Sequence, residues 1–153
     1  MRVALGADHA GFQLKEEVRR YLDALRVPYQ DFGTHTSASV DYPGFAARVA
    51  GAVASGEFDR GILVCGTGIG MAIVANKTTG IRAAPISDLE SARLGREHND
   101  INILTLAGRL TPADRALEIV RVFLDTPFAS DRHRHRLDQI AAIELQRDRR
   151  AGS

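Results

Sequence analysis

The chain has 153 residues, of which 44% are hydrophobic and 25% are charged, and its formal net charge is +1. This size and composition predict one globular domain over residues 1–153 and exclude disordered, collagenous and disulfide-stapled proteins. The small net charge gives no reason to expect nucleic acid or an anionic membrane as a partner. The chain has a single cysteine, no signal-peptide pattern and no apolar run of the ~20 residues that span a bilayer, so we expect a cytoplasmic protein.

Short apolar runs alternate with amphipathic segments along the chain, which is typical of strands alternating with helices. A last helix is expected over about 132–147, with Leu137, Ile140 and Ala141 on one face, followed by a mobile tail over about 147–153. Before it we expect, in chain order, a strand over 2–7, a helix ending near 25, a strand over 27–32, a polar loop over 33–40 and a helix over about 41–55. The middle of the chain is expected to form a strand over 61–65, a glycine loop over 66–70 and a short helix ending near 76. These are followed by a strand over 81–86, a helix over about 88–98, a strand over 101–106 and a helix over about 111–125.

Two of these helices have recognisable start signals. Asp41 stands just before Pro43, and proline fits the first turn of a helix because the missing N–H would be unpaired there anyway. Ser87 and Glu90 have the S-x-x-E spacing of a capping box, in which each side chain binds a free backbone N–H of the first turn. We therefore expect helices to begin near residues 42 and 88.

Five strands alternating with helices predict a single-domain, three-layer α/β/α sandwich around a five-stranded, parallel, Rossmann-like sheet. In such sheets, ligands bind at the carboxyl ends of the strands. Asp8 and His9 follow the first strand, Cys65 ends the third, and Arg109 follows the fifth. We therefore expect these polar and reactive residues to meet at one edge of the sheet.

The stretch GILVCGTGIGMAIVANK, residues 61–77, predicts a buried strand, a glycine loop and a helix. Backbone N–H groups in such a loop can converge on an anion, and they favour the thiolate form of a nearby cysteine. Cys65 would then serve as a base or a nucleophile. The alternative is a cysteine that only packs in the core, which is common for this residue type.

Three familiar anion-binding loops do not fit these glycines. A dinucleotide fingerprint needs G-x-G-x-x-G, whereas the chain has G-x-G-x-G, and Asp88 is better explained as a residue at a helix start than as a ribose ligand. A P-loop needs G-x-x-x-x-G-K-S/T, which is absent. A cysteine-phosphatase loop needs an arginine where this chain has Met71. A cradle for a smaller anion beside a thiol remains.

Histidines and arginines elsewhere suggest a second set of polar contacts. His9 and His98 lie near the ends of predicted elements and outside apolar stripes, which favours function over core packing. Arg132 and Arg136 are four residues apart on one helix face, where two forked guanidinium groups would suit a phosphate. A solvated basic face is the simpler explanation of that spacing.

A base beside an oxyanion cradle, an acid/base histidine and a phosphate clamp can together remove a proton from carbon next to a carbonyl. Returning that proton to the neighbouring carbon interconverts an aldose and a ketose. A second acid/base group would first open the sugar ring. These steps need no cofactor, and no metal-binding motif stands in the sequence.

Several motifs closely resemble the B-type ribose-5-phosphate isomerases, of the family that includes galactose- and allose-6-phosphate isomerases. The resemblance extends over most of the chain, to about residue 146. It rests on the combination of DHAG (8–11), DYP (41–43), CGTGIG (65–70), ANK (75–77), GIR (80–82), HND (98–100) and RH (132–133).

This resemblance implies a Rossmann-like enzyme that interconverts ribose 5-phosphate and ribulose 5-phosphate through a cis-enediolate. It implies no cofactor, and a homodimer or dimer of dimers with each active site at the subunit interface. Some family members use a glutamate just after the glycine loop in place of the cysteine. Here that position is Met71, which cannot accept a proton, so Cys65 is expected to be the base.

The resemblance also implies roles for individual residues. Cys65 would move the proton between C1 and C2, Thr67 would assist ring opening, and His98 would be the ring-opening acid/base. The implied substrate-binding residues are Asp8, His9, Tyr42, Gly66, Gly68, Ile69, Gly70, Asn99, Arg109, Arg132 and Arg136.

Two alternatives remain open from the sequence. The substrate could be another phosphorylated sugar, such as allose or galactose 6-phosphate or a tetrose phosphate, because pocket depth cannot be read from the residues. The chain could also be a non-catalytic phosphosugar sensor. The combination of Cys65 and His98 argues against a sensor, since a binding protein needs no base.

Overall fold

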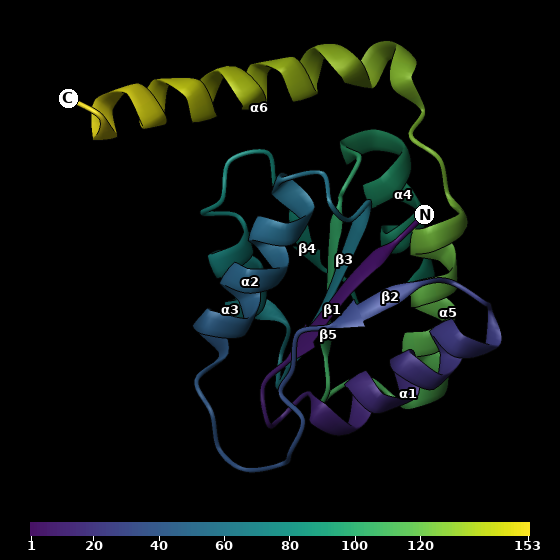
Figure 1. Cartoon of the computed structure of the whole chain (residues 1–153). Coiled ribbons are helices and arrows are strands. Elements are labelled where there is room, and N and C mark those ends of the chain that lie inside the picture. Colours follow the sequence, from purple (N-terminus) through teal and green to yellow (C-terminus); the bar gives the residue numbers. More distant parts are fainter.

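Five short strands form one parallel sheet in the order β2-β1-β3-β5-β4 in the computed structural model, which describes all residues, 1–153 (Figure 1). The predicted all-parallel five-stranded sheet is therefore confirmed. β1 and β3 are in register from Val3 opposite Arg60 to Ala7 opposite Val64. The strands are β1 (Val3–Ala7), β2 (Tyr29–Asp31), β3 (Arg60–Cys65), β4 (Ala83–Pro85) and β5 (Ile103–Ala107).

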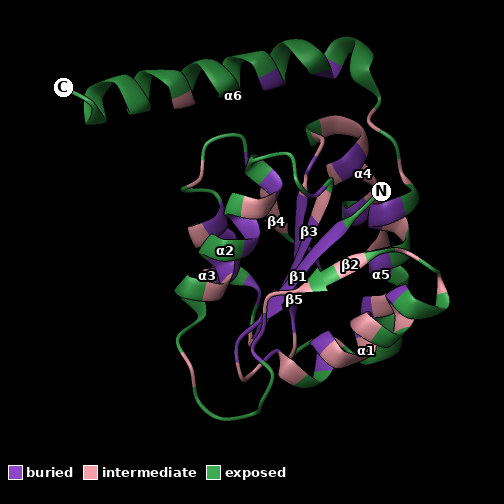
Figure 2. Ribbon diagram, viewed as in Figure 1, coloured by how far each residue is buried: buried purple, intermediate pink, exposed green.

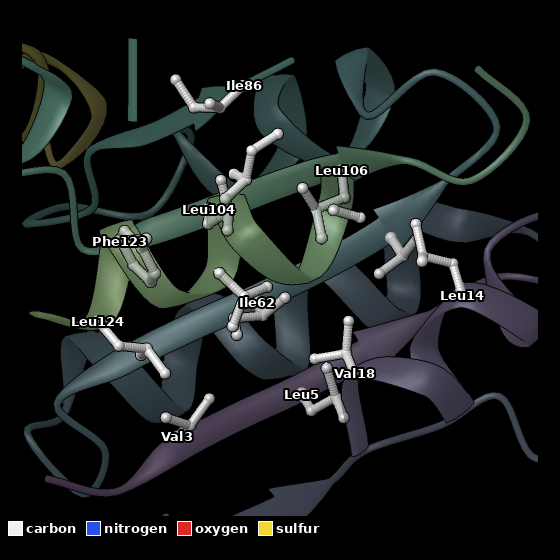
Figure 3. Packing of buried hydrophobic residues seen from close by; sticks show 14 of the residues in the cluster. Val3, Leu5, Leu14, Val18, Ile62, Ile86, Leu104, Leu106, Phe123 and Leu124 are labelled. Atoms are coloured by element: carbon white, nitrogen blue, oxygen red, sulfur yellow. The ribbon is translucent and has the colours of Figure 1, made fainter. Parts of the chain in front are cut away.

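Helices cover both faces of the sheet and complete the predicted three-layer sandwich. α1 (Phe12–Ala24), α4 (Leu89–Asn99) and α5 (Ala113–Asp125) cover one face. Figure 3 shows the core on this side, where Leu5, Ile62 and Leu104 of the strands meet Val18 and Phe123 of the helices. α2 (Tyr42–Ala54) and α3 (Ile69–Ala75) cover the other face, on a smaller core that includes Cys65 and Met71.

The last helix, α6 (Ser130–Ala151), leaves the sandwich and runs beyond the edge at which the strands begin (Figure 1). It continues past its expected end near residue 147. Of the three residues predicted to share one face, Leu137 is buried whereas Ile140 and Ala141 are exposed, and most of the helix is exposed (Figure 2). An extended helix on the outside of the sandwich has little core to face. No helix of the chain has the length and apolar character needed to cross a membrane.

The start of α4 differs from the predicted capping box. The N-cap is Asp88, whose Oδ1 accepts the N–H of Ser91 at 2.7 Å, and not Ser87. An aspartate one residue later offers a charged acceptor with the same reach, which stabilises the positive end of the helix. Asp41 occupies the N-cap of α2 as predicted, but its side chain makes no capping hydrogen bond.

Gly11 makes the closest approach between a helix start and the sheet. A Cβ atom at this position would lie 2.2 Å from the carbonyl oxygen of Val64, which belongs to the central strand β3. The atoms that a Cβ would meet first are backbone atoms of Val64, which cannot rotate away as a side chain can. The glycine therefore brings the start of α1 against the carboxyl end of β3, next to the residues of the predicted site.

We expect Gly11→Ala to destabilise the fold by about 1–3 kcal/mol through overpacking. The matched control is Gly51→Ala in α2, where a Cβ would meet no atom within 4 Å, so the helix gains up to about 1 kcal/mol. Urea unfolding measures both changes. Equal stabilities of the two variants would contradict this account of Gly11.

Candidate active site

A cavity of about 470 Å³ lies at the carboxyl edge of the sheet. The ends of β1, β3 and β5 and the starts of α2 and α3 contribute its walls, as the parallel topology predicts. The residues that line it are Asp8, His9, Ala10, Tyr42, Cys65, Gly66, Thr67, Ile69, Gly70, Ile73 and Arg109.

Cys65 is 4% exposed and lies at the inner wall of this cavity. The backbone N–H of Gly68 donates to its Sγ at 3.2 Å. Gly68 has φ +76°, and a Cβ there would come within 3.2 Å of the Leu106 backbone, so the position requires glycine. Thr105 anchors the turn by donating its Oγ1 hydroxyl to the Gly68 carbonyl at 2.7 Å.

Free backbone donors surround the thiol. The N–H groups of Gly66, Thr67 and Gly70 make no hydrogen bond within the chain. They belong to the loop between β3 and α3 and to the first turn of α3, and all three residues line the cavity. Such a group of oriented N–H donors can stabilise a negative oxygen that forms beside the sulfur.

Asp8 and His9 are held in place by backbone contacts. The Oδ1 atom of Asp8 accepts the N–H of Gly11 at 3.0 Å. The Nδ1 atom of His9 lies 3.2 Å from both the backbone nitrogen and the carbonyl oxygen of Val40. The Nε2 atom of His9 has no partner in the chain and is free to contact a ligand.

Tyr42 lies over the glycine loop at the mouth of the cavity. A Cβ on Gly70 would come within 2.6 Å of the Tyr42 ring, so glycine is what allows the ring to approach the loop. Arg109 approaches from the other side, since a Cβ on Gly66 would meet its side chain at 3.4 Å. The exposed side chains of Ile69 and Ile73 surround the opening.

His98, Asn99, Arg132 and Arg136 lie at the opposite edge of the sheet. His98 is in the last turn of α4, which runs back towards the strand starts. Three residues after this helix ends, the carbonyl of Asn102 accepts the N–H of Gly61, near the start of β3. Because β3 rises ~3.3 Å per residue over the four residues from Gly61 to Cys65, the two groups are separated by about 13 Å along the strand direction.

The second group is assembled around a pair of histidines. The ring of His98 stacks on that of His133, with centroids 4.2 Å apart and planes at 20°. Arg132 Nε lies 3.4 Å from one ring nitrogen of His133, and Arg136 Nη1 lies 3.4 Å from the other. The start of α6 therefore places both arginines beside the end of α4.

His133 is the side chain that sequence reasoning missed. In the run RHRHR (132–136), His133 and His135 are two residues apart and so lie on different faces of the helix, where His133 is buried and His135 is exposed. Nothing in the periodicity of α6 indicates the stack on His98. Ile73 is a second omission, although its spacing of four residues from Ile69 could have placed it on the same helix face.

A second cavity, of about 670 Å³, is larger than the one that contains Cys65. It lies between α6 and the segment from β4 to α4, and apolar side chains including Ile81, Leu94, Ile140 and Ile143 line it. Of the predicted site residues only Asn99 belongs to it. Its lining offers no thiol and no histidine.

A model of a protein family described as ribose/galactose isomerase matches residues 3–140. The chain is 45% identical to ribose-5-phosphate isomerase B of Escherichia coli over 147 residues, which cover 96% of this chain and 99% of that protein. It superposes on the structure of ribose-5-phosphate isomerase B of Clostridium thermocellum with a TM-score of 0.94 and 48% identity, covering 95% and 99% of the two chains.

The chain belongs to the ribose/galactose isomerase family. A family member from Mycoplasma genitalium, whose structure contains bound ribulose 5-phosphate, has a TM-score of 0.90 and 35% identity, covering 94% of this chain and 96% of that one. The resemblance drawn from the motifs is thereby confirmed, together with the fold and the assignment to the aldose–ketose isomerases.

The surroundings of His133 in this chain should make its stability depend on pH. Burial lowers the pKa of His133 below its ordinary value of 6.5. A positive charge on His98 lowers the pKa further, as do the guanidinium groups of Arg132 and Arg136, while Glu97 acts in the opposite direction. The folded chain therefore disfavours the protonated form of this histidine.

Because the pKa is lower in the folded than in the unfolded chain, His133 reduces stability as the pH falls below about 6.5. We expect the free energy of unfolding of the native chain to decrease more between about pH 7 and about pH 5 than that of His133→Asn. Urea unfolding at the two pH values tests this. A pH dependence that is the same in both proteins would argue against a neutral, buried His133.

Proposed function

We propose that this chain interconverts ribose 5-phosphate and ribulose 5-phosphate in the cytoplasm, through a cis-enediolate and without a cofactor. The observation that carries the proposal is the thiol of Cys65 beside free N–H groups of the glycine loop. Relatives named ribose-5-phosphate isomerase B support the choice of a pentose phosphate. A catalytic cysteine must remain reduced, which agrees with a cytoplasmic location.

Proton transfer is assigned to Cys65. As a thiolate it removes the proton from C2 of the open-chain aldose and returns it to C1, giving the ketose. The enediolate formed between these steps carries a negative oxygen, which the N–H groups of Gly66, Thr67 and Gly70 stabilise. Met71, which follows Gly70 in α3, is buried and cannot act as a base.

Ring opening is a separate task, because ribose 5-phosphate exists mainly as a closed ring. It needs one group that takes the proton of the C1 hydroxyl and one that supplies a proton to the ring oxygen. We assign this exchange to His98, with Asn99 orienting the sugar and Thr67 assisting through its hydroxyl. Asp8, His9 and Tyr42 then contact the sugar phosphate from the cavity wall.

The distance between Cys65 and His98 requires two copies of the chain. We propose a homodimer, or a dimer of dimers, in which the α4 end and α6 of one protomer cover the cavity of its partner. Exposed apolar side chains on both surfaces support this arrangement: Ile69 and Ile73 beside the cavity, and Ile140, Ile143 and Leu145 on α6. Burying such side chains drives association.

The same arrangement would complete the phosphate site. Arg109 is the arginine that lines the cavity of its own protomer. Arg132 and Arg136 from the partner would add two forked groups to the doubly charged phosphate. Their neighbour His133, held neutral, would leave the positive charge of the guanidinium groups for the ligand.

We expect Cys65→Ala to abolish turnover of ribose 5-phosphate, a loss of at least about 10³-fold, because it removes the group assigned to proton transfer. The fold should persist, since alanine fills most of the buried volume. A coupled assay with purified protein, with ribose 5-phosphate and a panel of tetrose and hexose phosphates, measures the loss. The Gly51→Ala variant is the control for a change away from the cavity.

Two results would count against the proposal. Appreciable turnover by Cys65→Ala would remove the cysteine from the role of base. Turnover of a hexose or tetrose phosphate alone by the native chain would move the substrate to another member of the same chemical class.

A further inference from the structure

The turn that follows His98 and Asn99 has an unusual backbone. Asp100 is the C-cap of α4 and has the left-handed conformation, with φ 46° and ψ 46°. Its N–H donates to the carbonyls of Gly95 and Arg96, which closes the last helical turn. Glycine is the most common residue in this conformation because a Cβ is disfavoured there, and asparagine and aspartate tolerate it better than other residues. An aspartate also places a carboxylate at this turn, which a glycine would not.

The Asp100 carboxylate is held by two arginines from different elements. Arg96 Nη1 donates to Oδ1 at 2.8 Å, and Arg82 Nη2 donates to Oδ2 at 3.0 Å. Arg82 Nε also contacts the carbonyls of Asn99 and Asp100, each at 3.0 Å. The backbone of the turn and its one acidic side chain are thus fixed from both sides.

Arg96 connects this turn to the chain that leads into α6. Its side chain is 2% exposed, and besides Asp100 it donates to the carbonyl of Ile101 at 2.5 Å and to that of Thr126 at 3.1 Å. The N–H of Ala129 donates to the carbonyl of Glu97 at 3.0 Å. The same cluster therefore holds both the end of α4 and the start of α6.

The negative charge of Asp100 lies among the positive charges of several arginines. Arg60 is half-buried nearby, and its Nε has no hydrogen-bond partner. Burial lowers the pKa of Arg60, and the positive charge of Arg96 lowers it further, whereas the negative charge of Asp100 raises it. Without the carboxylate, the positive charges of Arg60, Arg82 and Arg96 would repel one another at the end of α4.

We infer that Asp100, clamped by Arg82 and Arg96, is a positioning residue for His98 and Asn99 in the ring-opening step. The inference rests on the proposed function, since it assigns a role through His98. Asp100 acts through the backbone that follows these two residues and through Arg96, and it is not assigned any contact with the sugar. A misplacement of about 1 Å in a catalytic group is enough to slow a reaction by orders of magnitude.

Two substitutions separate the carboxylate from the backbone conformation. Asp100→Gly removes the side chain but favours the left-handed turn, so the helix end should still form. Asp100→Asn removes the negative charge and keeps fewer of the hydrogen bonds to the arginines. The matched control is Asp125→Asn, which breaks another arginine–aspartate pair with the same spacing, Arg121–Asp125, near the end of α5.

Two readouts distinguish ring opening from proton transfer. Turnover of ribose 5-phosphate requires both steps. Uptake of deuterium from D₂O at C1 of ribulose 5-phosphate, followed by NMR, requires only proton transfer, because this ketose cannot close a five-membered ring when its C5 oxygen carries the phosphate. A loss of folded protein would lower both rates by the same factor.

We expect Asp100→Gly to slow turnover about tenfold while deuterium uptake changes less than about twofold, with a smaller effect for Asp100→Asn and none for Asp125→Asn. His98→Asn serves as the reference and should slow turnover alone, by about 10²-fold or more. If His98→Asn behaves in this way but Asp100→Gly lowers neither rate, or both equally, the positioning role is wrong. If His98→Asn itself lowers both rates equally, the proposed role of His98 is wrong and the role of Asp100 falls with it.

Discussion

The parallel direction of the strands determines where the candidate functional residues of this chain lie. In a parallel sheet every strand ends at one edge, and each connecting helix must run back to the other. Residues that follow strands therefore gather at one edge, and residues that end helices gather at the opposite one. Cys65 follows this rule at the end of β3, and His98 follows it at the end of α4. A cysteine and a histidine that belong to one proposed reaction thus lie on opposite edges of one chain.

Each edge is built by a different kind of interaction. At the carboxyl edge, glycines without side chains let backbone approach backbone, so that Gly11 lies on β3 and the loop after Cys65 presents free N–H groups. At the other edge, side chains make the contacts. The arginines around Asp100 fix the end of α4, and the stacked rings of His98 and His133 attach α6 to it. The free backbone N–H groups at the first edge can bind an oxyanion, whereas guanidinium groups can bind a phosphate.

Much of the fold and one half of the site could be predicted from the sequence. Apolar runs separated by helix signals gave all five strands, and the rule for parallel sheets correctly brought Asp8, His9, Cys65 and Arg109 to one cavity. The other half could not be assembled in this way, because the contact between α4 and α6 depends on side-chain packing that leaves no periodic signal. The role inferred for Asp100 likewise has only the four-residue spacing from Arg96 as a trace in the sequence.

The central claim is that each active site takes Cys65 from one protomer and His98 from its partner. Mixing Cys65→Ala with His98→Asn under conditions that exchange subunits tests it most directly, with a different affinity tag on each chain to measure the hybrid. Each variant alone should be nearly inactive on ribose 5-phosphate. Random exchange makes half of the dimers hybrids, each with one intact site of two, so about a quarter of the native activity should return. A mixture that contains the hybrid dimer but remains inactive would contradict the shared site.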